Sequence, residues 1–481
     1  MPDLDHAPES EAAPAVRGRS PSIAAGLSFL WPGLGQMFLG RRISAAVLAV
    51  PALIVVALGV MQFSQGVAMF AASLWDPSYF FAVVAGVAFL AVLRVVAVGH
   101  AFVSGSPGRR PRAREATFLA TLLVLIVAMH GAIAYGAWTW YDTSVSIQGN
   151  DLLAFAPDSG STDDPYADPT PWPSDSSSPG PDESTSPTPR PSEPVAPTKP
   201  KNPNRITFLL VGIDSMPGRS HALTDTLIVV SLDKSTEKAS IVSVPRDTAN
   251  FDLYYGGWVG PLVKINTILS AASSPSFGSP DPPMKTLENE VGFLVGVPID
   301  YYAAIDLVGF SKMIDAVGGV DVVNPKIIND PHTHLYVPAG AIHLDGPSAL
   351  KYVRSREGAG DSDYTRSHRQ QDVLMSLAHK ISGSSIVGHL GTLLSLAGKY
   401  IATDFPLSST RNYVSAAEKI SIYDRCVLSA PYSYHPDSST TRGVWTSRLD
   451  MGRMAGLSIE MFGQDSRYYG PYGAVPAACS S

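Results

Sequence analysis

Three long runs of apolar residues dominate the N-terminal part of the chain. They extend from Ile43 to Phe63, from Tyr79 to Val103 and from Ala116 to Tyr141. Charged side chains are almost absent from them, and the second run is interrupted only by Arg94 and His100. A helix needs about 20 apolar residues to cross the hydrocarbon core of a bilayer. Each run therefore predicts a membrane span.

A shorter apolar segment, SIAAGLSFLWPGLGQMFLG, precedes these runs and is broken at Trp31, Pro32 and Gly33. This pattern is compatible with a kinked span or with a re-entrant hairpin. The membrane region, residues 21–141, is accordingly expected to have three or four spans. Their number decides whether the polar tail, residues 1–20, is cytoplasmic or external.

Basic residues predict the orientation of the membrane region. The loop GRRPRAR, from Gly108 to Arg114, separates the second and third long runs, whereas the loop between the first and second has no basic residue. Loops rich in Lys and Arg stay on the cytoplasmic side. We therefore expect a multi-pass protein of the cell membrane in which everything after Tyr141 is extracellular.

Residues 142–204 have a different composition, rich in Pro, Ser and Asp. Proline stiffens a chain, and repelling acids together with the lack of apolar residues prevent a packed core. We expect a disordered linker that holds the following domain away from the membrane.

From residue 205 onward, short apolar strands alternate with amphipathic helices. Strands are expected at 205–214, 225–233, 238–247, 299–307 and 319–325, and helices at 283–296, 308–319 and 366–381, with 347–356 a short helix or a strand. This alternation is typical of a layered α/β domain. It extends over residues 205–385, and residues 386–481 are its C-terminal part or an extension.

The charge balance bears on possible partners. The net charge is −7, and residues 205–481 carry 23 basic and 26 acidic side chains. No part is strongly basic, so a nucleic-acid partner is not expected. Against this background, the stretch YVRSREGAGDSDYTRSHRQ, from Tyr352 to Gln370, gathers four arginines.

Two aspartates stand next to apolar strands and are candidate metal ligands. Asp214 ends one expected strand and Asp225 opens the next. Carboxylates at neighbouring strand ends can share a hard cation such as Mg²⁺. Aspartates in turns and helix caps are common, however, and this alternative stays open on these two residues alone.

The arginine cluster is a candidate phosphate site. If residues 352–356 are extended, Arg354 and Arg356 point to the same side, and a helix beginning near Thr365 places Arg366 and Gln370 on one face. The arginine fork matches two oxygens of a phosphate. The alternative is a solvated loop in which the arginines pair with nearby aspartates.

The motifs LLVGIDS, TDTLIVVSLD, SVPRDT, KIN, IDYYAAIDLVGF, LDGPSALKYVRSR and DYTRSHRQQ occur in this order. In order and spacing they resemble the LytR-CpsA-Psr family over about residues 205–385. The resemblance implies an α/β/α sandwich with an apolar cavity for a polyprenyl tail. It also implies an enzyme that transfers a glycopolymer from a polyprenyl-pyrophosphate carrier to peptidoglycan.

The resemblance also assigns roles to residues. Those matching the family's pyrophosphate and metal site are Asp214, Asp225, Arg246, Arg354, Arg356, Arg366 and Gln370. Family members often have an arginine two places before the second aspartate, where this chain has Leu223, so Arg219 is a candidate replacement.

The expected chemistry follows from these roles. Asp214 and Asp225 would hold Mg²⁺ or Mn²⁺, the arginines would stabilise charge on the pyrophosphate, and Asp247 or Asp363 would be the general base. Polyprenyl phosphate would leave, and a phosphodiester would join polymer and peptidoglycan, with lipid of the membrane as a further partner. Two alternatives remain: a polyprenyl-pyrophosphate hydrolase, and a non-catalytic module that binds wall polymer.

Overall fold

The computed structural model describes residues 20–469. The exceptions are residues 107–109, 150–201, 215–222, 257–258, 261–262, 274–276, 357–361, 383–389, 418 and 437–444. The predicted polar tail and most of the predicted linker lie outside the described residues. The chain divides into two compact units, Met1–Tyr141 and Asp142–Ser481, which are described in turn.

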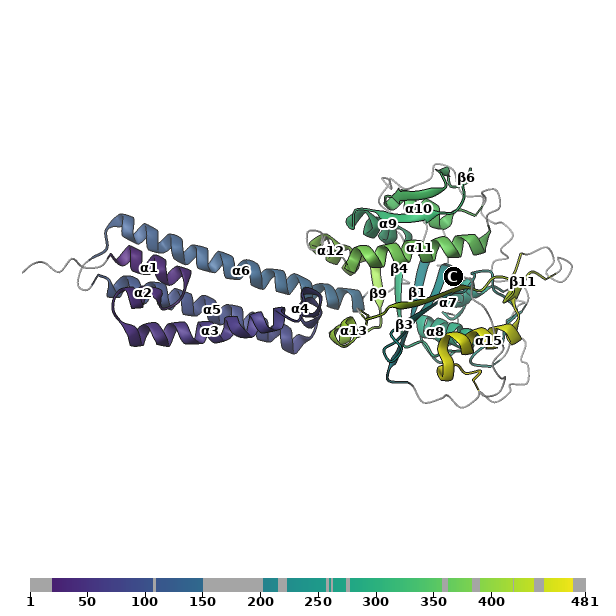
Figure 1. Cartoon of the computed structure of the whole chain (residues 1–481), viewed down its shortest axis with the longest axis horizontal. Helices are drawn as coiled ribbons and strands as arrows, with labels where there is room; N and C mark the ends of the chain where they lie inside the picture. The colour runs from purple at the N-terminus through teal and green to yellow at the C-terminus, as the bar shows by residue number, and fades with distance from the viewer. Residues whose placement is uncertain are drawn as a thin grey trace, which may run out of the picture. The chain divides into compact units, whose positions relative to one another are not determined.

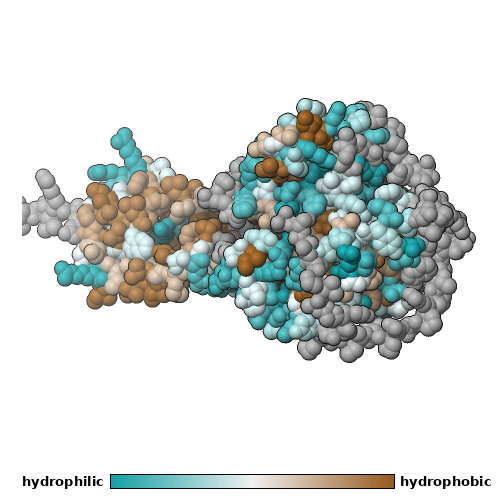
Figure 2. Space-filling view, turned by 45° about the vertical axis from the view of Figure 1, so that its right-hand side comes forward, coloured by the Kyte–Doolittle hydropathy of each residue, from teal (hydrophilic) through white to brown (hydrophobic). Residues whose placement is uncertain are grey.

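The first unit is helical and hydrophobic. Its helices are α1 (Pro21–Leu30), α2 (Leu34–Phe38), α3 (Arg42–Phe63), α4 (Val67–Ser73), α5 (Pro77–Ser104) and α6 (Ala113–Gly149), the last of which ends eight residues beyond Tyr141. Among the described residues, α3, α5 and α6 are long and apolar enough to cross a membrane, with mean hydropathies of 2.6, 2.6 and 2.2. They coincide with the three predicted spans, and their exposed side chains are mostly hydrophobic (Figure 2).

The broken segment before these helices forms a helical hairpin. Gly33, at a φ of 100°, lies between α1 and α2, which contact each other. The hydroxyl of Ser28 donates to Gln36 Oε1 at 3.0 Å, and a Cβ on Gly35 would lie 2.0 Å from the Ala24 carbonyl oxygen. Only glycine permits this approach. Whether this segment crosses the bilayer, giving four spans rather than three, stays a prediction.

The second unit contains a six-stranded mixed sheet in the order β10-β3-β2-β1-β4-β9. Its strands are β1 (Arg205–Asp214), β2 (Leu223–Asp233), β3 (Lys238–Ser243), β4 (Tyr301–Asp306), β9 (Ile401–Thr403) and β10 (Ile422–Val427). Strand β1 pairs antiparallel with β2 and parallel with β4. Smaller pairs are formed by β5 (Val320–Asn324) with β8 (Gly340–Leu344), β6 (Ile328–Asp330) with β7 (Leu335–Val337), and β11 (Ser433–Tyr434) with β12 (Arg448–Leu449).

Helices cover both faces of the large sheet (Figure 1). One layer contains α7 (Ile268–Ala271), α8 (Pro283–Val295) and α15 (Met451–Phe462), and the other α9 (Leu307–Ala316), α10 (Gly346–Arg354), α11 (Asp363–Ser382) and α12 (Leu390–Tyr400); α13 (Thr410–Ala417) follows β9. Alternate β1 residues, such as Leu209 and Val211, pack with Leu287 of α8 and Leu457 of α15. The predicted α/β/α sandwich is confirmed, whereas its apolar lipid cavity stays a prediction.

The segment before the arginine cluster is helical up to Arg354. Of the two alternatives for residues 347–356, the helix is therefore observed as far as Arg354, and the extended arrangement considered for residues 352–356 does not form there. Asp345 caps α10 by accepting from the Ser348 backbone N–H at 2.9 Å, and Ala349, Tyr352 and Val353 bury one helical face. Apolar residues at i, i+3 and i+4 fit a helix packed against α9 and α11, and not a strand.

Candidate active site

Asp214 and Asp225 lie at the same end of the sheet because β1 and β2 are antiparallel neighbours. Asp214 faces Leu223 in the pairing, and the register shifts between Gly212 and Ile213, which leaves Asp225 without a partner residue on β1. Such a β-bulge turns a side chain away from its regular direction. A Cβ on Gly212 would approach the Thr226 Cβ to 2.9 Å, so glycine is needed next to the bulge. The two predicted metal ligands are thus brought to one place.

Each of these aspartates faces an arginine from another element. Arg246, which follows β3, donates from Nη1 to Asp225 Oδ1 at 2.9 Å, and Arg354, the last residue of α10, lies 3.7 Å from Asp214 Oδ2. Burial alone would raise the pKa of Asp225, but the positive charges of Arg246 and Arg366 outweigh it and lower that pKa. Asp225 is therefore ionised.

A second carboxyl pair, Asp247 and Asp363, lies beside the first. Asp247 follows Arg246 after β3, and Asp363 is the first residue of α11. A hydrogen bond joins the two carboxyl groups. Burial raises the pKa of Asp247, and the hydrogen bond and repulsion from Asp363 raise it further. Burial acts in the same direction on Asp363, but Arg366 and the hydrogen bond prevail and lower its pKa to about 2. Asp247 is therefore the more basic carboxyl group of the two.

Lys264 completes the surroundings of this pair and was not among the predicted site residues. Its Nζ lies 2.6 Å from Asp247 Oδ1, and it precedes the short helical turn at Ile265–Thr267. In the sequence, only its place in the KIN motif pointed to a role for Lys264. Nothing in the local pattern shows that this loop returns to the end of β3.

Helices α10 and α11, which carry the arginine cluster, are held together by side-chain contacts. Arg366, in the first turn of α11, is 5% exposed and lies 2.8 Å from Asp363 Oδ1. Arg369 donates to the Ser355 carbonyl and lies over the Tyr352 ring, while Gln370 Nε2 donates to the Val353 carbonyl at 3.3 Å. Arg366 and Gln370 were both predicted to bind substrate. In the structure, Arg366 lies against the carboxylates, whereas the Gln370 amide donates a hydrogen bond to α10.

Arg356 lies between the two helices. It follows Ser355, whose backbone is extended after the end of α10, and its own N–H donates to Asp330 Oδ2 at 3.1 Å. Its positive charge contributes to the low pKa of Asp363. Arg356 thus joins Arg246, Arg354 and Arg366 around the carboxylates. Arg219, the candidate replacement for Leu223, lies outside the described residues.

Several buried polar atoms at the site make no hydrogen bond within the described part of the chain. They include Nε of Arg246, Nε of Arg366 and Oδ1 of Asn266. The Asn266 backbone N–H donates to the Arg246 carbonyl at 3.3 Å, which places Asn266 beside the end of β3. Buried donors without acceptors are rare in folded proteins, and two guanidinium groups that still have N–H groups to offer fit an anionic ligand.

The donor set fits a magnesium or manganese ion shared with a substrate. No group of three or more His, Cys, Asp or Glu side chains that could hold a metal occurs among the described residues. Mg²⁺ commonly binds through one or two carboxylates together with phosphate oxygens and waters. Asp214 and Asp225 supply two carboxylates, so an incoming phosphate would have to supply further ligands.

A family model decides the classification of the chain. The LytR_cpsA_psr family model matches residues 180–449. The chain belongs to the LytR_cpsA_psr family. The match includes all of the site described above and extends the predicted similarity to β12, so most of the region after residue 385 is part of the family domain.

Named relatives of the chain are teichoic acid transferases. The chain is 30% identical over 208 residues to the polyisoprenyl-teichoic acid–peptidoglycan teichoic acid transferase TagV of Bacillus subtilis, covering 42% of this chain and 50% of TagV. It is 34% identical over 201 residues to TagU of Bacillus anthracis, covering 41% of this chain and 60% of TagU. The chain therefore spans only about half of the length of such relatives. The crystal structure of B. subtilis TagV matches 54% of this chain and 97% of that structure, at a TM-score of 0.42 and 22% identity.

Proposed function

We propose that this protein transfers a glycopolymer from a polyprenyl-pyrophosphate carrier to peptidoglycan and releases polyprenyl phosphate. The observation that carries this proposal is the set of arginines from three elements, Arg246, Arg354 and Arg366, two of which keep buried Nε–H groups without acceptors. Membership in a family whose relatives are named for this transfer supports the same reaction.

The donor pyrophosphate would bind where the arginines converge. A pyrophosphate diester carries two negative charges, and more charge collects on the leaving phosphate as the bond breaks. Arg354 at the end of α10 and Arg366 at the start of α11 approach this space from different directions. Preorganised guanidinium groups stabilise such developing charge without reorganisation at the moment of reaction. Arg356 adds positive charge beside them.

A metal ion fits this scheme at the neighbouring aspartates. Asp214 and Asp225 would hold Mg²⁺ or Mn²⁺, which when bound supplies positive charge to phosphate oxygens. The low pKa of Asp225 keeps its carboxylate charged for that role.

The Asp247–Asp363 pair would accept the proton of the attacking hydroxyl. The hydroxyl oxygen of the wall sugar forms a bond to the phosphorus that carries the polymer, and the bond from that phosphorus to the bridging oxygen breaks. The bridging oxygen leaves with polyprenyl phosphate, and the hydroxyl proton passes to the carboxyl pair. Asp247 is the stronger base of the pair because its pKa is raised. A module that only binds polymer has no need of a general base.

The location of the reaction follows from the predicted topology. The basic loops place the second unit outside the cell, where ATP is absent, and the pyrophosphate bond supplies the driving force. Three apolar helices that precede the domain in the sequence would keep it near a donor whose lipid tail lies in the membrane. Peptidoglycan and the lipid-linked polymer are thus the expected partners.

Reconstitution tests this proposal. The full chain in detergent micelles is incubated with a synthetic polyprenyl-pyrophosphate oligosaccharide, peptidoglycan and Mg²⁺, and the digested wall is analysed by mass spectrometry. We expect a muropeptide that carries the oligosaccharide through a phosphodiester, and its loss when EDTA is added. Free oligosaccharide phosphate without any linked muropeptide would instead identify a hydrolase.

A further inference from the structure

An exposed aromatic pair lies next to the active site and has no role in the scheme above. Trp445 is 58% exposed, although the residues that follow it, Thr446 and Ser447, are buried. Its ring lies 3.9 Å from the ring of His435, centroid to centroid, with 34° between the planes. Single exposed hydrophobic residues are common on protein surfaces. The contacts of this pair, and not its exposure alone, distinguish it.

The His435 ring is fixed by hydrogen bonds on both nitrogens. Nδ1 lies 2.9 Å from the Thr446 carbonyl, which only accepts, so Nδ1 carries the proton. Nε2 lies 3.1 Å from the Tyr364 hydroxyl and, in the neutral ring, accepts from it. The ring beneath Trp445 is therefore held in one orientation, as a binding surface requires.

The aromatic pair is connected to the chain segments that carry Asp247 and Asp363. Tyr364 directly follows Asp363 at the start of α11. Ser447, two residues after Trp445, donates its backbone N–H to the Asp247 carbonyl at 2.8 Å, and its hydroxyl lies 3.3 Å from that of Tyr364. A ligand on Trp445 would thus lie beside the groups assigned to receive the acceptor proton.

We propose that Trp445 and His435 form a binding subsite for a sugar ring of the peptidoglycan acceptor. This inference rests on the proposed function. A pyranose presents a flat face of C–H groups and a polar rim, and Trp offers a large, rigid apolar surface with an N–H at its edge. The ring of Trp445 packs against the polar ring of His435. A lipid tail would require a continuous apolar patch instead.

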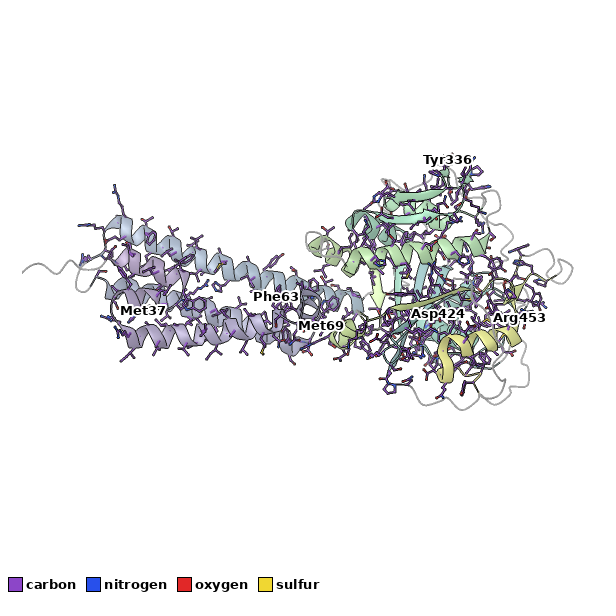
Figure 3. All side chains as sticks on the ribbon, in the orientation of Figure 1. Met37, Phe63, Met69, Tyr336, Asp424 and Arg453 are labelled. Carbon is purple, nitrogen blue, oxygen red and sulfur yellow. The ribbon has the colours of Figure 1, made fainter. Side chains whose placement is uncertain are left out.

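The test measures binding of an acceptor fragment without any donor. The probe is the lipid-free disaccharide–peptide unit of peptidoglycan, released by a muramidase, and its affinity for the full chain is measured by calorimetry. Trp445→Ala should weaken binding about tenfold or more, as expected for an aromatic anchor, and Trp445→Phe should restore most of it. Tyr336→Ala is the matched control, because Tyr336 is also exposed, at 68%, but lies on β7 at the outer edge of the unit (Figure 3).

Three results would overturn the subsite. The first is that Trp445→Ala binds the fragment as tightly as the unaltered chain, and the second is that Trp445→Ala and Tyr336→Ala lose equal affinity. The third is that Trp445→Ala no longer binds phosphatidylglycerol vesicles but still binds the glycan. The last would assign Trp445 to a membrane surface. Because fragment binding needs neither donor nor turnover, loss of binding in Trp445→Ala alone supports the subsite even if the unaltered chain transfers no polymer. Such a failure of transfer would count against the proposed function only.

Discussion

At the scale of single residues, the reaction depends on the ionisation of Asp247. Its pKa lies above the ordinary value because it is buried and bonded to Asp363. A general base works only when deprotonated, so the transfer rate should fall as the pH drops through this raised pKa. We expect the acid limb of the pH–rate profile at a higher pH than an ordinary aspartate would give, and Asp247→Asn should lose most activity at every pH.

Asp363→Asn provides the complementary measurement. It removes the negative charge that helps to raise the pKa of Asp247. Whatever activity remains should therefore have its acid limb displaced to lower pH. An acid limb that stays in place, or moves to higher pH, would show that the two carboxyl groups do not act as a pair.

The sequence identified much of this site but not its contacts. The structure brings together most of the predicted site residues, namely Asp214, Asp225, Arg246, Asp247, Arg354, Arg356, Asp363 and Arg366. Lys264 and Asn266 were missed because a loop distant in sequence carries them to β3. The pairing of Asp247 with Asp363 was also not predictable, since it depends on how α11 docks beside the end of β3.

At the scale of elements, α8 carries a buried carboxyl group whose charged form destabilises the fold. Glu290 is fully buried, and burial raises its pKa from 4.5 to about 7, although Oε2 accepts from the Tyr254 N–H at 2.8 Å. Because the folded pKa is the higher one, folding favours the protonated form. The preference for the protonated form stabilises the fold fully below pH 4.5, and this stabilisation is lost as the pH rises through about 7.

Glu290→Gln should remove this dependence. The variant keeps the shape of the side chain and stays neutral, so its melting temperature at pH 8 should exceed that of the unaltered chain. At pH 4 the two should differ little. Thermal unfolding of the second unit in detergent, followed at both pH values, checks this expectation. A variant that melts lower at pH 8 would mean that the charged form of Glu290 stabilises the fold.

The elements also show where local patterns fail. Long apolar runs predicted α3 and α5 within two residues at each end, because helix length in a membrane is set by the bilayer, whereas α6 continues eight residues past the predicted end. The segment PSALKYVRSR allowed both a helix and a strand, and the strand was used to align Arg354 with Arg356. The helix prevails because Tyr352 and Val353 pack against α9 and α11, contacts that no local pattern contains.

At the scale of the whole molecule, the account requires the second unit to be outside the cell. Tyr336→Cys places a thiol on an exposed strand of that unit, and Arg110→Cys places one in the basic loop. A membrane-impermeant maleimide added to wall-stripped cells should label Tyr336→Cys at once and Arg110→Cys only after permeabilisation. The unaltered chain, with its native Cys426 and Cys479, gives the background. Labelling in the opposite order would reverse the topology.

The central claim is that Arg246, Arg354 and Arg366 bind the donor pyrophosphate, and one substitution tests it most directly. Arg354→Lys keeps the charge but loses the planar fork that can hold two phosphate oxygens. Arg453→Lys is a matched control, because Arg453 also faces an aspartate, Asp450, at 3.5 Å compared with 3.7 Å for Arg354 and Asp214, but is exposed on α15 (Figure 3). Both variants should melt close to the unaltered chain.

The measurement is the rate at which the full chain transfers a synthetic lipid-linked oligosaccharide to peptidoglycan. For Arg354→Lys, we expect a loss of roughly 30- to 1000-fold, as for removal of one charge-assisted contact to a transition state. Arg453→Lys should transfer at the unaltered rate. If Arg354→Lys also transfers at a near-normal rate, Arg354 does not clamp the pyrophosphate, and the central claim is contradicted.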